Sequence, residues 1–427
     1  MLTGPGWAFA GRVGCAFVTT QHDDVLDPTT AADDAPLDGV RVVEISMYVQ
    51  GPVAGLTLAS LGADVVKIEP VGREDVMRSM GAMFGVRLDD RGRAWQYAAL
   101  NRNKRSIALD PTTETGREAF RRLIAGADVF VSNLRADGLA RLGADWETLS
   151  AINPRLVYAR GAGFALRGEL ADDPCQDTVG MAYGGFMDIT SATGEPNYPP
   201  GALSDVLTGT SLASAVMAGL VKRSITGRGS LVGTSQVQSL LWMQLLPVGM
   251  AATLGERMVR FSPVAPANPV FSVYPTADGY IAIAAIHPPQ WPPIAYTLGL
   301  EELLADERFG EFDALLRNRA EVVPILTERF RQRTTQEWWQ ALRAAGVWTA
   351  PVNRMEDLGS DAAVLDNEYL VTYPDGFVGP PAPFEVGEWR GARGVSAEYG
   401  EHTDAVLREL GYGDDEMVAL RVEGAIW

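Results

Sequence analysis

The sequence has few of the side chains that usually carry covalent or metal chemistry. Its 427 residues include two cysteines, Cys15 and Cys175, and three histidines, His22, His287 and His402. Two distant cysteines provide no disulfide framework, which fits a reducing compartment and predicts a cytoplasmic protein. Because cysteine and histidine are so scarce, a metal cluster or a histidine proton relay is poorly supplied, and we expect no bound metal.

Positive charge is also scarce. Lysine and arginine number 36 against 54 aspartates and glutamates, which gives a formal net charge of -18 at pH 7. Binding to nucleic acid requires a positive surface that displaces counterions from phosphate, so the composition argues against a nucleic-acid partner. A hydrophobic content of 47% and a charged content of 21% are ordinary for a soluble enzyme of two or three domains.

Signal-peptide and membrane-span patterns are both weak. Residues 1–35 contain two short apolar stretches, but Arg12 separates them and no basic region precedes them, so we interpret them as an N-terminal extension. The most apolar helix candidate, residues 206–221, is interrupted by Thr208, Gly209 and several further small polar residues. We therefore expect no run of membrane-spanning length and no membrane partner.

Short apolar runs after residue 36 predict a parallel sheet. Helices are expected from Pro52 onward and at residues 114–125. The expected strands are residues 40–45, 64–68, 106–109, 129–131 and 156–159. Alternating strands and helices indicate an α/β fold whose ligands bind at the carboxyl ends of the strands. The loop after the first strand lacks the Gly-x-Gly pattern of a dinucleotide site, which argues against a nicotinamide enzyme.

The pattern of expected strands and helices changes after residue 230. Strands at 270–274 and 280–286 flank Ala277-Asp278-Gly279, which is a hairpin signal. A helix is expected at 313–330, and another opens with the capping-box residues Thr334 and Glu337. Helices at 403–410 and 414–423 are expected to return to the first domain. We thus predict a large Rossmann-like domain of residues 36–230 and 346–427 and a small α+β domain of residues 231–345.

Asp205 is a carboxylate placed where a long apolar helix begins. A helix N-terminus favours negative charge, which predicts that Asp205 stays ionised and able to act as a nucleophile. The same pattern also describes an ordinary helix start, with Ser204 as the N-cap and Asp205 as a first-turn acid. Gln50, at the end of the first strand, either donates to a developing oxyanion or caps its own loop. The residues alone leave both pairs of interpretations open.

Seven segments of the chain together resemble the class III coenzyme A transferases, a family that includes formyl-CoA transferase, carnitine CoA-transferase and the α-methylacyl-CoA racemases. The segments are LDGVRVVEIS with VQGP (37–52), SLGADVVKIEP (60–70), NRNKRSIALD (101–110), ADVFVSN (127–133), TGRG (226–229), APVN (350–353) and GEHTDAVLRELG (400–411). The resemblance implies two domains, an interlocked homodimer, and a CoA thioester as substrate with no permanently bound cofactor.

The resemblance also implies a mechanism. The family's nucleophilic aspartate matches Asp205, and the residue that steadies the reacting carboxylates matches Gln50. Asp205 would attack an acyl-CoA to form a mixed anhydride, become an aspartyl-CoA thioester, and pass CoA to a carboxylic acid acceptor. The CoA contacts implied for this chain are Val49, Arg73, Lys104, Leu109, Asn133 and Arg141.

Two other functions stay open beside this acyl-CoA:carboxylate CoA-transferase. Racemases of the family need a histidine where this chain has Gln176, and their supporting glutamate falls on His287. A neutral amide cannot remove or return an α-proton, so an α-methylacyl-CoA racemase or epimerase is the less favoured alternative. Asp177, which follows Gln176, is expected to have a structural or supporting role. A non-catalytic acyl-CoA-binding protein is the second alternative.

Overall fold

The structure is a computed structural model that describes residues 35–83, 86–87, 94–191, 194–256 and 266–427. The N-terminal extension expected at residues 1–35 lies outside the described residues, apart from Ala35.

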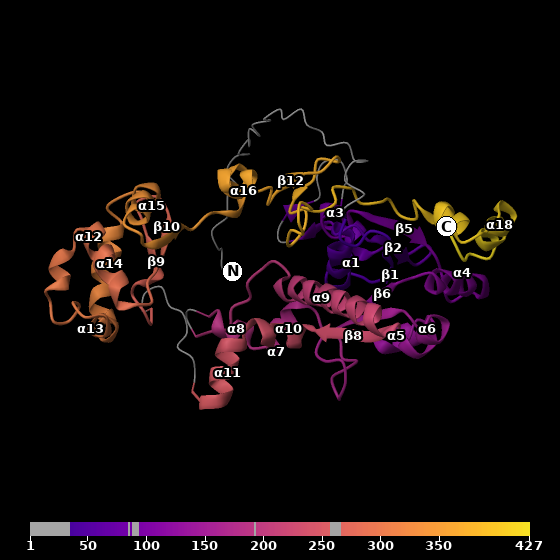
Figure 1. Ribbon diagram of the computed structural model, residues 1–427, viewed down its shortest axis with the longest axis horizontal. Helices are drawn as coiled ribbons and strands as arrows, with labels where there is room; N and C mark the ends of the chain where they lie inside the picture. The colour runs from indigo at the N-terminus through magenta and orange to yellow at the C-terminus, as the bar shows by residue number, and fades with distance from the viewer. Residues whose placement is uncertain (1–34, 84–85, 88–93, 192–193, 257–265) are drawn as a thin grey trace, which may run out of the picture.

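A six-stranded parallel sheet forms the centre of the larger lobe, with strand order β5-β2-β1-β6-β7-β8 (Figure 1). The strands are β1 Arg41–Ile45, β2 Asp64–Glu69, β5 Lys104–Ala108, β6 Val129–Ser132, β7 Val157–Ala162 and β8 Ser230–Ser235. All five strands predicted for this sheet are confirmed, with ends that differ by up to three residues. The sixth, β8, was not predicted.

Alternate side chains of each strand point to opposite faces of this sheet, and each face has its own helices. Val42 and Val65 pack with residues of α1 (Gln50–Ser60) and α9 (Leu203–Thr226). Val43 and Val66 pack instead with residues of five other helices. These are α4 Glu114–Ala125, α5 Ala136–Arg141, α6 Trp146–Ile152, α17 Thr403–Glu409 and α18 Asp414–Val422. The terminal helices therefore return to the large sheet, as expected.

Helix α9 is longer than the sequence suggested. It has 24 residues, and by length and composition it is apolar enough to cross a membrane, as are α10 and α11 together despite a bend of 83° between them. The prediction that no run reaches this length is wrong. The helix continues through Thr208 and Gly209 because it packs closely on α1, α10 and the sheet. At Gly209, a Cβ would lie 2.5 Å from the backbone oxygen of Gln50. Buried core helices pass the same length and composition test.

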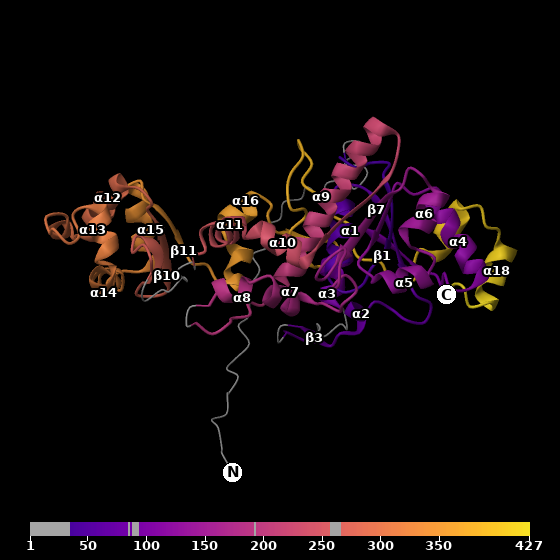
Figure 2. The same ribbon diagram turned by 90° about the horizontal axis from the view of Figure 1, so that it is seen from below.

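The smaller lobe has a separate core around an antiparallel sheet (Figures 1 and 2). Its strands are β9 Phe271–Pro275, β10 Tyr280–Ala284 and β11 Trp348–Pro351, and its helices are α12 Trp291–Leu298, α13 Phe312–Arg317, α14 Arg319–Phe330 and α15 Thr335–Ala344. The predicted hairpin and the Thr334–Glu337 capping box are confirmed. The single helix expected at 313–330 is divided at Asn318.

The large sheet extends to Ser235 and the small one to Pro351, a few residues beyond the boundaries expected at 230 and 346.

Shorter elements connect these parts. They are α2 Val76–Ser79, α3 Trp95–Asn101, α5 Ala136–Arg141, α7 Asp177–Tyr183, α8 Phe186–Ile189, α10 Gln236–Met243, α11 Leu245–Leu254, α16 Ala362–Asp366, β3 Ala82–Met83, β4 Val86–Arg87, β12 Val371–Thr372 and β13 Val378–Gly379, with 3₁₀ helices Pro288–Gln290, Glu301–Leu304 and Met355–Ser360.

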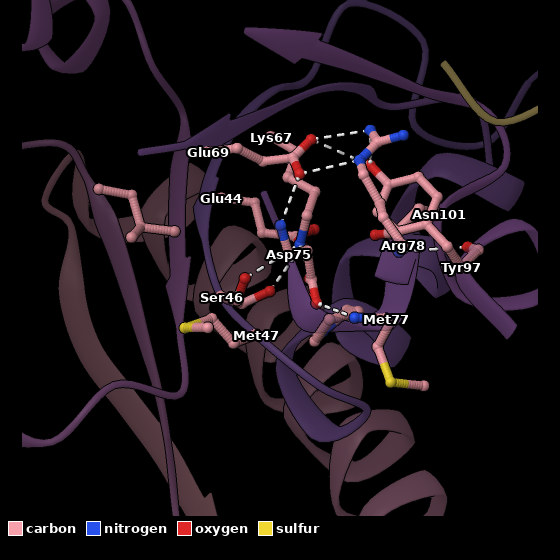
Figure 3. Close-up of polar contacts among 12 residues, drawn as sticks. Glu44, Ser46, Met47, Lys67, Glu69, Asp75, Met77, Arg78, Tyr97 and Asn101 are labelled. Carbon is pink, nitrogen blue, oxygen red and sulfur yellow. Dashed lines mark hydrogen bonds and ion pairs between the residues drawn. The ribbon is translucent and has the colours of Figure 1, made fainter. Parts of the chain in front are cut away.

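A buried network of charges connects β1, β2 and β5, and Figure 3 labels its members Glu44, Lys67 and Asp75. Lys67 pairs with Glu44 at 3.3 Å and with Asp75 at 3.0 Å, and Lys104 pairs with the second oxygen of Glu44 at 2.9 Å. The side chains of these four residues are at most 2% exposed. Burial alone would raise the pKa of Glu44, but Lys104 and Lys67 hold it below the ordinary value. These charges are therefore tolerated in the core because they compensate one another.

A second buried pair continues the network at the end of β2 (Figure 3). Arg78 donates to both carboxylate oxygens of Glu69, at 3.0 and 2.8 Å, and its guanidinium lies over the ring of Tyr97. Although burial opposes ionisation, the hydrogen bonds and charge of Arg78 lower the pKa of Glu69 to about 2. This bidentate pair, together with the Lys67–Asp75 pair, holds the segment between β2 and α2 against the sheet.

We predict that replacing Lys67 will destabilise the fold strongly. Lys67→Met removes one cation and leaves Asp75 buried without its ion-pair partner, so the free energy of unfolding should fall by about 3–5 kcal/mol in denaturant titrations. Arg122→Ala is the control, because the Arg122–Glu118 pair is exposed (42% and 54%). It should cost less than about 0.5 kcal/mol. Equal losses in the two variants would contradict this account of the network.

Candidate active site

A cavity of about 670 Å³ lies at the carboxyl ends of β1, β6 and β7. This is the edge of a parallel sheet at which ligands were expected. The cavity gathers Val49 and Gln50 at the start of α1, Asn133 after β6, and Asp205 at the start of α9. Four of the eight predicted site residues therefore line one cavity, although they are up to 156 positions apart in the sequence, from Val49 to Asp205.

The loop between β1 and α1 forms one wall of the cavity and is held at several points. The side-chain amide of Asn133 donates to the backbone oxygen of Met47 at 2.8 Å and accepts from its N–H at 3.0 Å. Lys67 donates to the backbone oxygen of Ser46 at 3.0 Å, which connects this loop to the buried charges. Gln50 donates to the backbone oxygen of Ala162 at 2.8 Å and is 5% exposed. These hydrogen bonds tie the loop to β2, to the end of β6 and to β7.

Two residues of the cavity wall have a backbone conformation that is unfavourable for side chains other than glycine. Tyr48 has a φ of 63° and Ala202 a φ of 53°. Both line the cavity, one before α1 and the other before α9. A left-handed non-glycine residue costs about 1–3 kcal/mol, and such residues persist where surrounding contacts enforce them. Their location at the starts of the two cavity helices is typical of a functional site.

Asp177, the first residue of α7, caps the N-terminus of α9. Its Oδ1 accepts from the backbone N–H groups of Ser204 at 2.8 Å and Asp205 at 3.2 Å, and from the Ser204 hydroxyl at 2.7 Å. Its Oδ2 accepts from the Tyr198 hydroxyl at 3.0 Å. The helix begins at Leu203 with Ala202 at the N-cap, so the interpretation of Ser204 as the N-cap is wrong. The negative charge attracted by this helix end is that of Asp177.

Asp205 is consequently not held ionised by the helix end. Burial raises its pKa to about 7, the neighbouring charge of Asp177 adds to this shift, and a hydrogen bond from Gln236 opposes it. The expectation that Asp205 stays ionised is therefore corrected, because Asp177 occupies the helix amides that were to stabilise its charge. Near pH 7 the carboxyl is divided between its protonated and ionised forms. This is the range in which a carboxyl serves best as a nucleophile or base.

The other four predicted CoA contacts do not line this cavity. Lys104 is 4% exposed and its ammonium is engaged by Glu44, and Leu109 is 1% exposed. Arg73 is exposed next to β2, and Arg141 is exposed at the end of α5, where it pairs with Asp137 at 3.3 Å. Among the described residues, the cations that line the cavity are Arg135 and Arg160.

Three residues at the cavity were not singled out by sequence reasoning. Gln236 donates to Asp205 at 2.5 Å, and the Cys175 thiol donates to Gln236 at 3.1 Å. Arg160 ends in the cavity wall, and its Nε is buried with no hydrogen-bond partner among the described residues. A glutamine that follows a strand has no sequence signature, but Arg160 directly follows the strand predicted at 156–159, at the edge of the sheet where ligands were expected.

The residues that bear on the racemase alternative are separated. Gln176 lines the cavity as the N-cap of α7, whereas His287 lies in the smaller lobe after β10 and does not line the cavity. In the described part of the chain, histidine, cysteine, aspartate and glutamate form no group of three that could hold a metal ion.

The sequence profile described as CoA-transferase family III matches residues 37–403. The chain belongs to this family. It is 32% identical to succinate–glutarate CoA-transferase of Agrobacterium fabrum, covering 88% of this chain and 96% of that one. It is 29% identical to human succinyl-CoA:glutarate CoA-transferase, covering 90% and 88% of the two chains. The fold matches a CAIB/BAIF family protein from Brucella suis with a TM-score of 0.78 and 32% identity, over 88% of this chain and all of the other.

The family membership makes the chain a CoA-transferase, and it gives the cavity a chemical context. The alignment covers both lobes and the segments that carry Gln50, Asn133 and Asp205. The predicted family is thus confirmed, and the α/β fold with a parallel sheet and a separate antiparallel sheet is confirmed with it.

We predict that Asp177→Asn will lower the pKa of Asp205. The amide keeps an oxygen for the α9 backbone but removes the negative charge that opposes ionisation of Asp205. Carboxyl ¹³C NMR titration of both full-length proteins should show the Asp205 resonance, assigned with Asp205→Asn, titrating at lower pH in Asp177→Asn than in wild type, where we expect a pKa of about 7. Asp173→Asn, an exposed residue of the same cavity, is the control and should leave this titration unchanged. An unshifted titration in Asp177→Asn would refute the assignment.

Proposed function

We propose that this enzyme moves CoA from an acyl-CoA thioester to a carboxylic acid through covalent intermediates on Asp205. The observation that carries the proposal is the environment of this side chain. Asp205 is a partly buried carboxyl at a cavity, held by a neutral amide donor, with a pKa raised to about 7. At neutral pH an appreciable fraction of Asp205 is therefore ionised. Because its negative charge is only weakly stabilised, the carboxylate remains a good nucleophile.

The reaction balances without an added cofactor. The ionised carboxylate attacks the thioester carbonyl, an Asp205–acyl anhydride bond forms, and CoA leaves as a thiolate. The thiolate then attacks Cγ of Asp205 and displaces the donor acid as a carboxylate. The acceptor carboxylate attacks the resulting aspartyl thioester and releases CoA thiolate, which finally attacks the acceptor carbonyl and frees Asp205. Each step exchanges one activated acyl group for another of similar energy.

The substrates proposed are short acids whose second polar group suits the cations of the cavity. Relatives of this chain are named for succinyl-CoA with glutarate, for succinyl-CoA with D-citramalate, and for acetyl-CoA with oxalate. Arg135 and Arg160 line the cavity, where each pairs with an exposed aspartate, Asp137 at 3.8 Å and Asp172 at 3.3 Å, and we propose that a substrate carboxylate or the phosphates of CoA replace these partners. Among the predicted CoA contacts, Val49 and Asn133 are the ones that the cavity supports.

The residues at the cavity favour this reaction over racemisation. Proton transfer on two faces of an α-carbon requires two groups that titrate and are free to reach the substrate. Gln176 does not titrate, and both carboxylate oxygens of Asp177 are engaged by α9 and Tyr198. Asp205 therefore acts without a second base.

The apolar surface of α10 and α11 supports a dimer as part of the proposal. All residues of α11 are at least partly exposed, and Trp242, Leu246 and Leu254 are 74%, 70% and 62% exposed. Apolar surface of this extent is usually covered by another protein. We propose that a second copy of the chain covers it, with the interlocked arrangement implied by the resemblance.

We predict that Asp205→Asn will abolish transfer. The amide is not a nucleophile toward a thioester, so turnover should fall by at least about 10⁴-fold. Mass spectrometry would follow acyl-CoA products from succinyl-CoA or acetyl-CoA with glutarate, oxalate or D-citramalate. Hydroxylamine should trap wild-type Asp205 as a hydroxamate during turnover and should trap nothing in the variant. Transfer that survives in Asp205→Asn would reject the covalent mechanism, and Glu118→Gln, which changes an exposed acid outside the cavity, is expected to keep wild-type activity.

We predict that the wild-type chain is a dimer in solution and that charge on α10 and α11 disrupts it. Trp242→Glu combined with Leu246→Glu places two carboxylates in the proposed apolar contact, where their desolvation is unfavourable. Size-exclusion chromatography with light scattering should give twice the 45.9 kDa chain mass for wild type and a smaller mass for the variant. The exposed pair Glu118→Ala with Arg122→Ala is the control. A monomeric wild-type chain would reject the dimer.

A further inference from the structure

Gln236 is buried at the cavity between two polar groups. It is the first residue of α10, directly follows β8, and is 2% exposed. Its Nε2 donates to Oδ1 of Asp205 at 2.5 Å, and its Oε1 accepts from the Cys175 thiol at 3.1 Å. Because the thiol contact occupies the amide oxygen, the donor side of the carboxamide faces Asp205. The contact is thus a hydrogen bond from a neutral donor to the carboxylate.

The surrounding backbone leaves space for this amide. Gly180 of α7 lies against it, and a Cβ at this position would be 2.3 Å from Oε1 of Gln236. Any side chain at Gly180 would therefore push the amide out of place. Gln50, the glutamine predicted to steady the reacting groups, donates to the backbone of Ala162, so the amide that contacts the nucleophile is that of Gln236.

We infer that Gln236 is a catalytic residue of this transferase: it holds Oδ1 of Asp205 while Oδ2 reacts, and it stabilises the oxyanion that forms on Oδ1. This inference rests on the covalent mechanism proposed above. It also explains why a neutral amide suits the position, since a cation there would hold Asp205 ionised and weaken it as a nucleophile.

The role follows from the fate of the two oxygens. Oδ2 attacks the thioester, forms the anhydride bond and later leaves with the donor acid, whereas Oδ1 becomes the carbonyl oxygen. When CoA thiolate or the acceptor carboxylate attacks Cγ, the carbonyl π electrons move to Oδ1, and they return as the leaving group departs. Nε2 of Gln236 already lies within hydrogen-bond distance of this atom. A donor placed where negative charge develops lowers the barrier without reorganisation.

The charged and titratable groups around Asp205 are few, so the effect of Gln236 on ionisation is measurable. Asp177 on α7 opposes ionisation of Asp205, and Gln236 favours it. The Cys175 thiol, whose pKa burial raises to about 11, stays neutral near pH 7. Arg135 and Arg160 line other parts of the cavity wall, and Tyr198 contacts Asp177.

The test compares Gln236→Leu with the matched control Gln238→Leu, which changes an exposed glutamine of the same helix. Transfer would be measured from pH 5.5 to 9 with the donor and acceptor pair that wild type uses fastest. In Gln236→Leu we expect the acid limb of kcat/KM to move to higher pH, because ionised Asp205 loses its donor. Above that limb, we expect kcat to fall by about 10²-fold with KM changed little, since the oxyanion also loses its donor.

Gly180→Ala provides a second, independent variant. It displaces the amide without removing it, so it should shift the acid limb in the same direction by less. Circular dichroism would confirm that each variant is folded, and Gly180→Ala carries the test if Gln236→Leu is not. If the acid limb and the kcat of Gln236→Leu match those of Gln238→Leu, the proposed role of Gln236 is overturned. If Asp205→Asn itself transfers CoA, the covalent mechanism fails; if it is inactive and Gln236→Leu behaves like the control, only the role of Gln236 fails.

Discussion

The buried pairing of charges at one end of the parallel sheet is the constraint on which the cavity depends. Glu44, Lys67 and Lys104 come from three neighbouring strands, and none of them is stable in the core without the others. Lys67 also holds the backbone of Ser46, so the network fixes the loop that presents Val49 and Gln50 (Figure 3). The arrangement is an electrostatic support for a ligand site rather than part of the site itself.

Competition for one helix end explains the state of the nucleophile. The free N–H groups at the start of α9 attract one carboxylate, and Asp177 occupies them from a neighbouring helix. Asp205 is the third residue of the helix. Burial and the nearby negative charge of Asp177 raise its pKa to about 7, and one amide donor opposes this shift. A carboxylate that capped its own helix would be a poorer nucleophile because its charge would be better stabilised. Of the two acids near this helix end, Asp177 therefore caps the helix and Asp205 is the proposed nucleophile.

Much of the fold was predictable because its signals are local. The strands β1, β2 and β6 are short apolar runs, and α4 and α15 begin with capping residues that satisfy backbone N–H groups within the same turn. Strand β8 was missed because Ser230–Ser235 contains polar residues and a glycine, and its position depends on pairing with β7. The break at Asn318 was missed because apolar residues continue on both sides of it.

The sequence by itself determined the family, the α/β class and the candidacy of Asp205, Gln50 and Asn133, because these follow from motifs and from periodicity along the chain. Only the tertiary structure decided which neighbours each side chain has. It placed Lys104 in an ion pair instead of a cavity, gave the helix cap to Asp177, and brought Gln236 to Asp205 across 31 positions. The physical reason is that burial, pairing and pKa depend on contacts between segments that fold together, and no local pattern of residues encodes those contacts.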